Sequence, residues 1–150
     1  KKTQIKVDYL KLRSLLVSQR IEMDSRLYFN EKRYESLITD EEILQRENRD
    51  KFYYMLKLYG FNMCEIEKNS QFIEGEIGEE IIRISQSPKI DTIVLLGGHQ
   101  HYANIAKKVR SNLTKIEVAF FKQLTSTDLI KECNKFVDLN HHINKIQRKE

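Results

Sequence analysis

One segment, residues 90–102, constrains the fold of this chain more than any other. It begins with an apolar strand, Ile90–Leu96, which ends in two glycines and leads directly into a helix. In an open α/β sheet, ligands bind outside the carboxyl ends of the parallel strands, so the residues after this strand lie where chemistry is expected. The polar residues at that position are His99-Gln100-His101. We therefore expect the functional site in this loop.

Stretches with helical periodicity alternate with stretches of strand periodicity along the chain. Helices are expected over 7–17, from Thr39 through Leu58, over 76–85, over 103–113 and over 125–133. Strands are expected over 21–29, 61–66, 90–96, 116–121 and 136–139. Strands that alternate with helices form a mainly parallel sheet with helices on both faces. The pattern therefore predicts a Rossmann-like α/β fold with three α/β/α layers.

The boundaries of the long second helix are marked by specific residues. Thr39 and Glu42 have the spacing of a capping box, in which each side chain bonds the backbone of the other at the start of a helix. Gly60 lies where this helix should end in a left-handed residue. These signals predict a helix that begins directly after Thr39 and ends before Gly60.

The chain is expected to be one domain followed by a tail. Its 150 residues suffice for a single hydrophobic core, so we assign 1–139 to the domain and the polar, basic stretch 140–150 to a C-terminal tail that resembles a frayed helix. The longest apolar run, 93–96, is far shorter than the roughly 20 residues of a membrane helix. Cys64 and Cys133 lack metal or redox spacing, which predicts reduced thiols in a soluble cytoplasmic protein.

Charge is distributed unevenly, although the net charge of +4 is modest. Residues 71–100 contain two basic and five acidic side chains, whereas residues 101–150 contain ten basic and five acidic ones. An acidic centre beside a basic half suits an anionic polymer that approaches a metal or acid cluster. The same pattern is also typical of solvated helix faces, and both interpretations stay open.

Several of these segments follow one another in a characteristic order. They are a long helix that ends in glycine, an acidic helix start, the apolar strand with its glycines, a further strand and a closing helix and strand. The matching segments are Phe52–Phe61, Phe72–Ile84, Ile90–Tyr102, Ile116–Phe121 and Leu124–Leu139. With this order and spacing, the C-terminal two thirds of the chain resembles the NYN domain, a branch of the PIN-like metal-dependent ribonucleases. The resemblance implies a PIN-like fold and a function in RNA processing.

The resemblance also implies a metal site at the carboxyl edge of the sheet. Such nucleases hold one or two Mg²⁺ or Mn²⁺ ions with carboxylates, and the metal activates a water molecule. Glu74 takes the acidic position at the helix start, with Glu76 as its neighbour in a shifted register, while His99 and His101 replace the family's Asp-x-Asp pair. Imidazoles are poor ligands for Mg²⁺, so the histidines with Glu74 favour Mn²⁺ or Zn²⁺. Alternatively, they are ordinary polar loop residues.

The family's first strand, which ends in an acid, has two possible positions. Residues 7–12 look like the helix that follows that strand, which places the strand upstream of Lys1 and is the interpretation we favour. If Gln4–Val7 is instead a shortened first strand, Asp8 is its catalytic acid. Asn134 stands where the family has another aspartate. The predicted acidic set is therefore incomplete at several positions.

Basic side chains after the site are candidates for RNA binding. Lys107, Lys108 and Arg110 lie on the helix that follows the histidines, and Lys122 lies near another strand end, where they could contact phosphates or be solvated. We predict an RNA-processing domain derived from a metal-dependent endoribonuclease, with an altered or degenerate metal site. The alternative is a non-catalytic module that binds RNA or a protein partner, for example as a homo-oligomer.

Overall fold

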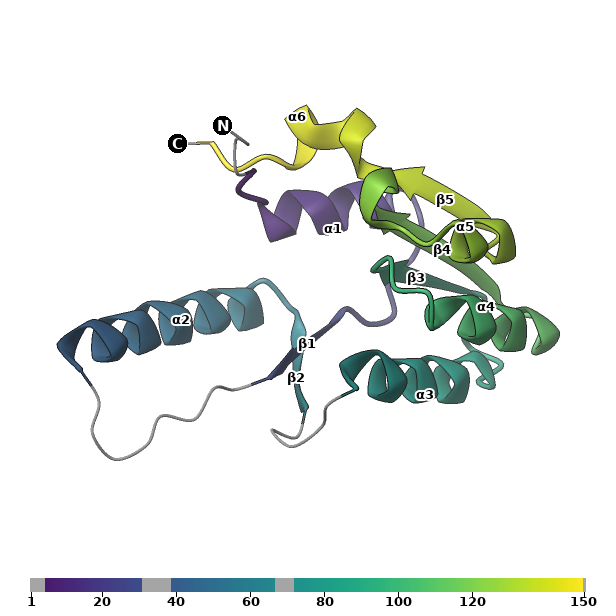
Figure 1. The fold of residues 1–150 in the computed structure, drawn as a ribbon, viewed down its shortest axis with the longest axis horizontal. Helices are drawn as coiled ribbons and strands as arrows, with labels where there is room; N and C mark the ends of the chain where they lie inside the picture. Colours follow the sequence, from purple (N-terminus) through teal and green to yellow (C-terminus); the bar gives the residue numbers. More distant parts are fainter. Residues whose placement is uncertain (1–4, 31–38, 67–71, 150) are drawn as a thin grey trace. The chain divides into compact units, whose positions relative to one another are not determined.

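The computed structural model describes residues 5–30, 39–66 and 72–149, in which helices and parallel strands alternate (Figure 1). The helices are α1 (Tyr9–Val17), α2 (Asp40–Leu58), α3 (Ile73–Ser85), α4 (Tyr102–Ser111), α5 (Thr127–Glu132) and α6 (Ile143–Ile146). The strands are β1 (Arg26–Asn30), β2 (Asn62–Ile66), β3 (Thr92–Leu96), β4 (Lys115–Phe120) and β5 (Lys135–Asp138). Two short 3-10 helices are η1 (Lys122–Leu124) and η2 (Leu139–His142). The predicted α/β class is confirmed.

The described strands form two parallel sheets, which belong to two compact units. The smaller unit, residues 21–71, contains the β1–β2 sheet and α2, and the larger unit, residues 1–20 and 72–150, contains the sheet β3–β4–β5 with the remaining helices. In the larger sheet Leu95 is paired with Val118, and Ala119 with Val137. The carboxyl ends of these three strands therefore lie at the same edge.

The larger unit has three layers, because β4 presents apolar side chains to both faces of its sheet. Ile116 and Val118 belong to a core shared with α3, α4 and α5. Ala119 belongs to a second core on the other face, which it shares with α1 and with the segment after β5 (Figure 1). All three β4 side chains are fully buried. The sheet is thus covered on both sides, as the alternation of helices and strands predicts.

The C-terminal segment differs from the predicted basic tail. Ile146 in α6 is fully buried and packs in the same core as Leu12 of α1. The backbone N–H of Asp8 donates to the Ile146 carbonyl at 2.8 Å, and that of Arg148 donates to the Lys6 carbonyl at 2.8 Å. The segment has few apolar side chains, so its composition indicated a tail. Those few side chains are nevertheless enough to attach it to α1.

The smaller unit is a helix on two strands. The Tyr53 ring of α2 lies 4.8 Å from the Phe29 ring of β1, and Leu56 is 1 % exposed. The capping box of Thr39 and Glu42 is present, and Gly60 ends the helix at a φ of 91°. Strand β1 begins at Arg26 rather than at residue 21, because its register on β2 begins with the pair Arg26 and Asn62.

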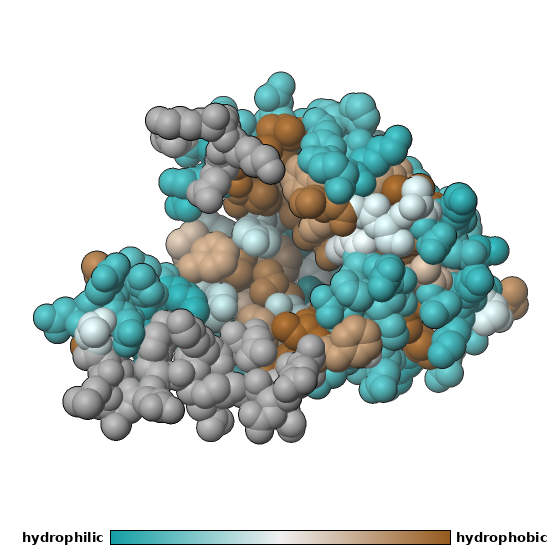
Figure 2. Space-filling view, viewed as in Figure 1, coloured by the Kyte–Doolittle hydropathy of each residue, from teal (hydrophilic) through white to brown (hydrophobic). Residues whose placement is uncertain are grey.

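The outer surface of the described elements is mainly hydrophilic on the face drawn in Figure 2, with apolar patches between the charged side chains. Among the described residues, no helix has the length and apolar character required to span a membrane. This agrees with the short apolar runs of the sequence.

Leu113, directly after α4, is a strained surface residue whose replacement by glycine should stabilise the protein. Its φ is 64°, in the left-handed region, and its side chain is 95 % exposed. A left-handed conformation costs a residue with a Cβ on the order of 1–2 kcal/mol, part of which glycine loses again through its freedom in the unfolded chain. We expect Leu113→Gly to raise the free energy of unfolding by about 1 kcal/mol in urea denaturation. Leu113→Ala, which keeps the Cβ, should change little, and an equal gain from alanine would contradict the backbone explanation.

Candidate functional site

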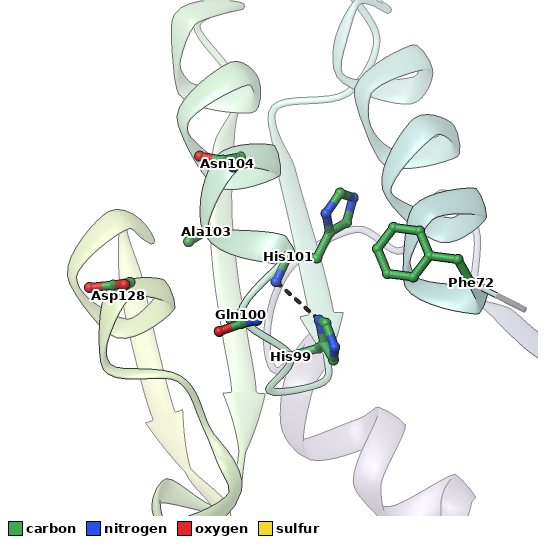
Figure 3. A pocket seen from close by; sticks show the side chains of 7 residues that line it. All are labelled: Phe72, His99, Gln100, His101, Ala103, Asn104 and Asp128. Carbon is green, nitrogen blue, oxygen red and sulfur yellow. Dashed lines mark hydrogen bonds between the residues drawn. The ribbon is translucent and has the colours of Figure 1, made fainter.

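The loop after β3 and the start of α4 form an open pocket. Its volume is about 420 Å³, and it lies at the carboxyl end of the sheet, where the sequence predicted the site (Figure 3). The lining residues are Phe72, His99, Gln100, His101, Ala103, Asn104 and Asp128. They come from the starts of α3, α4 and α5 and from the loop before α4. The lining combines imidazole, amide and aromatic groups with a single carboxylate.

Gly98 allows the loop after β3 to approach the loop after β4. A Cβ at this position would overlap the Leu124 carbonyl oxygen and would lie 2.9 Å from the Thr125 Cα. The Gly98 carbonyl accepts a hydrogen bond from the Ser126 N–H at 2.8 Å, immediately before α5. This contact brings the start of α5, including Asp128, to the pocket. The glycine is therefore required by packing and not only by the turn.

The two histidines make different contacts. His99 is exposed, and its Nδ1 accepts a hydrogen bond from the His101 backbone N–H at 3.0 Å. The His101 ring lies edge-on to the Phe72 ring at 4.6 Å between centroids, and its Nε2 lies 3.6 Å from the position of a Cβ on Gly78. Figure 3 shows His101 turned toward Phe72 and α3, and His99 near the end of β3 with its Nδ1 facing the backbone of the loop. The His99 ring also lies near Phe72, with 6.2 Å between the ring centroids.

Phe72 forms the α3 side of the pocket, and its ring packs against Gly75. Its ring would overlap a Cβ on Gly75, with the Cδ1 atom at 2.5 Å, so only glycine leaves room for the ring in this position. The ring contacts both histidines edge-on and remains 46 % exposed. An exposed aromatic ring in a polar pocket is available for stacking with a flat ligand.

Glu74 lies in the first turn of α3 and does not line the pocket. Its charge instead acts on Tyr102, the first residue of α4. Burial, and secondarily the negative charge of Glu74, raises the pKa of the Tyr102 hydroxyl to about 12. The Tyr102 side chain is only 5 % exposed and belongs to the core of the larger unit, so it keeps its proton at neutral pH.

The raised pKa of Tyr102 predicts a loss of stability at alkaline pH. An unfolded tyrosine titrates near 10.0 and the folded one near 12, so the unfolded chain loses its proton first. The stabilising contribution is complete below about pH 10 and is lost as the pH rises to about 12, at most roughly 3 kcal/mol. Urea denaturation across this range should show that the free energy of unfolding falls less steeply with pH in Tyr102→Phe than in Tyr54→Phe. The Tyr54 side chain is 63 % exposed, so Tyr54→Phe is the control. Equal slopes would assign the pH dependence to other groups.

Asp138 is a second carboxylate at the same edge of the sheet, at the end of β5. Burial opposes its ionisation, but the pKa of its carboxyl is held below the ordinary value. The causes are hydrogen bonds from the backbone N–H groups of Asn140 and Lys122, a hydrogen bond from the Asn140 side chain and the nearby His141. The carboxylate accepts from the Lys122 N–H at 3.4 Å and from the Asn140 N–H at 3.0 Å. Asp138 therefore has a structural role between η1 and η2.

The predicted RNA-binding residues are not grouped around the pocket. Lys107 and Arg110 both pair with Glu132 at the end of α5, at 3.7 and 3.3 Å. Lys108 is exposed in the same part of α4, whereas Lys122 follows β4 at the carboxyl edge of the sheet. Lys122 is thus the one of these four that shares the edge of the pocket. Phosphate contact by any of them stays a prediction.

Asp8 has a capping role in the structure. Its carboxylate accepts from the Leu10 and Lys11 N–H groups at 3.0 and 3.1 Å, so it is the N-cap of α1. In the predicted short strand, Gln4 lies outside the described residues, and Val7 makes a single antiparallel bridge to Gln147. The described part of that segment is not a parallel strand, and the geometry offers no support for Asp8 as a catalytic acid.

Comparison with known families decides the identity of this fold. The NYN domain family matches residues 2–140, which is most of the chain. The chain belongs to the NYN domain family. None of the curated proteins matches it. A protein of unknown function from Vibrio parahaemolyticus has a similar crystal structure, with 16 % identity, a TM-score of 0.72 and coverage of 92 % of this chain and 82 % of that one, which shows the same fold. The predicted family and PIN-like fold are confirmed.

The residues of this NYN domain do not fit the metal site that the family implies. Among residues 5–30, 39–66 and 72–149, no three His, Cys, Asp or Glu side chains are close enough together to hold a metal ion. Glu74, His99 and His101 therefore do not form a ligand set in this arrangement. Two imidazoles also replace the oxygen donors that Mg²⁺ prefers. Binding of Mn²⁺ or Zn²⁺ by these residues stays a prediction that requires them to rearrange.

Several residues at the site of this NYN domain were not found from the sequence. Phe72, Gln100, Asn104 and Asp128 line the pocket, but none of them was singled out as a site residue. Phe72 and Gln100 lie in segments that carried the resemblance, which was a usable signal. Asp128 also lies in such a segment, Leu124–Leu139, but its approach to the pocket depends on the contact between Gly98 and the loop after β4.

Proposed function

We propose that this NYN domain binds single-stranded RNA in the pocket after β3, and that its altered metal site does not support the hydrolysis typical of its relatives. The observation that carries the proposal is the pocket lining, in which amide, imidazole and aromatic groups outnumber the single carboxylate of Asp128. The family match supports RNA as the ligand. The domain would thus have kept the binding function of a metal-dependent endoribonuclease from which it derives.

The pocket offers the contacts that unpaired nucleotides require. Proteins recognise single-stranded RNA by stacking bases on aromatic rings and by hydrogen bonds to the base edges. The exposed Phe72 ring provides a stacking surface, and the Gln100 and Asn104 amides can donate and accept hydrogen bonds. The start of α4 adds a partial positive charge, which favours a phosphate.

Binding of a fluorescent single-stranded RNA tests the proposal. Phe72→Ala is expected to weaken binding by roughly 5- to 150-fold, because stacking on one aromatic ring contributes about 1–3 kcal/mol per base. Phe72→Tyr should bind almost as tightly as the unchanged chain. Leu113→Ala, which shortens an exposed apolar side chain outside the pocket, is the matched control and should have no effect. Equal affinities for the unchanged chain and Phe72→Ala would contradict binding in this pocket.

Cleavage of the same RNA with Mg²⁺ or Mn²⁺ separates the binding function from an enzymatic one. The unchanged chain and Glu74→Ala are both expected to leave the RNA intact. Metal-dependent cleavage that disappears in Glu74→Ala would overturn this part of the proposal and establish a nuclease with Glu74 in its mechanism. Absence of RNA binding altogether would favour the protein-binding module instead.

A further inference from the structure

The outer face of α2 carries apolar side chains that are exposed to solvent. We define this outer face as the side opposite Tyr53 and Leu56, with the residues Ile43, Leu44, Glu47, Lys51, Tyr54, Met55 and Leu58. We propose that it binds the same face of a second copy of the chain, with the two α2 helices antiparallel. This surface lies outside the pocket after β3, and the proposal does not depend on RNA binding.

Within the smaller unit, the packing of α2 leaves this face uncovered. Tyr53 contacts Phe29 of β1 and Leu56 is buried, so these two side chains mark the side of the helix that covers its own sheet. On the opposite side, Leu44 is 58 % exposed, Tyr54 63 % and Leu58 67 %. Apolar residues exposed together on one helix face mark an interaction surface more often than isolated ones do.

The spacing of the outer face is that of a helix that pairs with another helix. Leu44, Glu47, Lys51, Tyr54 and Leu58 are separated alternately by three and four residues. This interval places all five on one line along the helix, as in the contact line of a coiled coil. The α2 helix, with 19 residues, is long enough to present about two heptads of this pattern.

The smaller unit also lacks a large core of its own. Among the described residues of this unit, Leu56 and Ile66 are the only apolar side chains that are buried. A two-stranded sheet is marginally stable in water and needs packing against further elements. A second α2 helix on the outer face would bury additional apolar surface in this unit.

The charges of the outer face identify a second copy as the partner. Neither Glu47 nor Lys51 has an ion-pair partner within the part of the chain that the structure describes. In an antiparallel pair with its two-fold axis at the level of Arg49, Glu47 of each copy lies opposite Lys51 of the other. A parallel pair would place like charges opposite each other, which is unfavourable.

The same axis also matches the apolar residues. Leu44 then lies opposite Tyr54 of the second copy on both sides of the central charges, and Ile43 and Met55 lie on the two edges of this contact line. Such a surface is complementary to itself, which is the requirement for a symmetric dimer. The apolar layers would provide most of the affinity, because exposed ion pairs contribute little, and the charges would set direction and register.

Charge reversal tests this arrangement in the full chain by analytical ultracentrifugation over a range of concentrations. The unchanged chain is expected to dimerise, and Glu47→Lys or Lys51→Glu alone should raise the dimer dissociation constant by roughly tenfold or more, since each places like charges in contact twice. The double variant E47K/K51E should recover the affinity. Arg46→Glu, a charge reversal outside the outer face, is the matched control and should leave dimerisation unchanged.

The outcomes separate this interface from any other. Single variants that weaken the dimer, with recovery in the double variant, support the antiparallel pair. A chain that stays monomeric at all concentrations would overturn it. A dimer that does not respond to the single reversals, or that the double variant fails to recover, would place the interface elsewhere. Circular dichroism of each variant checks that the total helix content is unchanged.

Discussion

Replacement of Gly98 by alanine is expected to lower the free energy of unfolding by about 3 kcal/mol, the upper part of the range for overpacked sites. The added Cβ would overlap the Leu124 carbonyl oxygen and press on the Thr125 Cα, and both of these are backbone atoms that cannot move away independently. The hydrogen bond from the Ser126 N–H to the Gly98 carbonyl would be strained at the same time. Urea denaturation followed by circular dichroism measures the loss.

The neighbouring glycine provides the control for this prediction. A Cβ on Gly97 would lie 3.3 Å from the Cε2 atom of the Tyr102 side chain, which requires only a small shift of the ring. Gly97→Ala is therefore expected to cost less than about 1 kcal/mol. If both variants have the same stability, the close approach of the two loops is not what requires a glycine at position 98.

Replacement of Ile146 by alanine is expected to destabilise the protein by about 3 kcal/mol, within the 2–5 kcal/mol typical of a buried isoleucine shortened to alanine. Ile146 has no exposed surface and shares its core with Leu12, Ala119 and Leu139. The shortened side chain would leave a cavity between α1 and α6, because the surrounding helices cannot close completely around it. Thermal and urea denaturation measure the effect.

Lys145→Ala is the matched control, because Lys145 is exposed on the same short helix. It should change the free energy of unfolding by less than about 0.5 kcal/mol. An Ile146→Ala variant as stable as Lys145→Ala would show that the C-terminal segment is a dispensable tail, as its composition first indicated. If Ile146→Ala is less stable than Lys145→Ala by the expected amount, the C-terminal segment is part of the folded unit.

Most of the secondary structure followed from local patterns. The capping box of Thr39 and Glu42 and the left-handed Gly60 lie at the ends of α2 as predicted, because these signals depend only on neighbouring backbone groups. The first strand was predicted five residues too early, from residue 21 instead of Arg26. Alternating side chains indicate where a strand can form, but its pairing with β2 determines where it begins.

The candidate site was predicted in position but not in detail. The loop after β3 does form the pocket, because the end of an apolar parallel strand can be located from the sequence. The direction of His101 could not be predicted, since it depends on the space at Gly78 and on the Phe72 ring. The ion pairs of Lys107 and Arg110 with Glu132 likewise depend on how α4 packs on α5.

The amino-acid sequence by itself determined the order of the helices and strands, the family and the place of the pocket, because periodicity, capping residues and linked motifs are properties of neighbouring residues. Only the tertiary structure decided that Ile146 belongs to the core and that Gly98 holds two loops together. It also decided that both histidines of this NYN domain lie edge-on to the Phe72 ring. The physical reason is that a pattern shows which face of an element is apolar, whereas packing between distant segments selects the surface that this face meets.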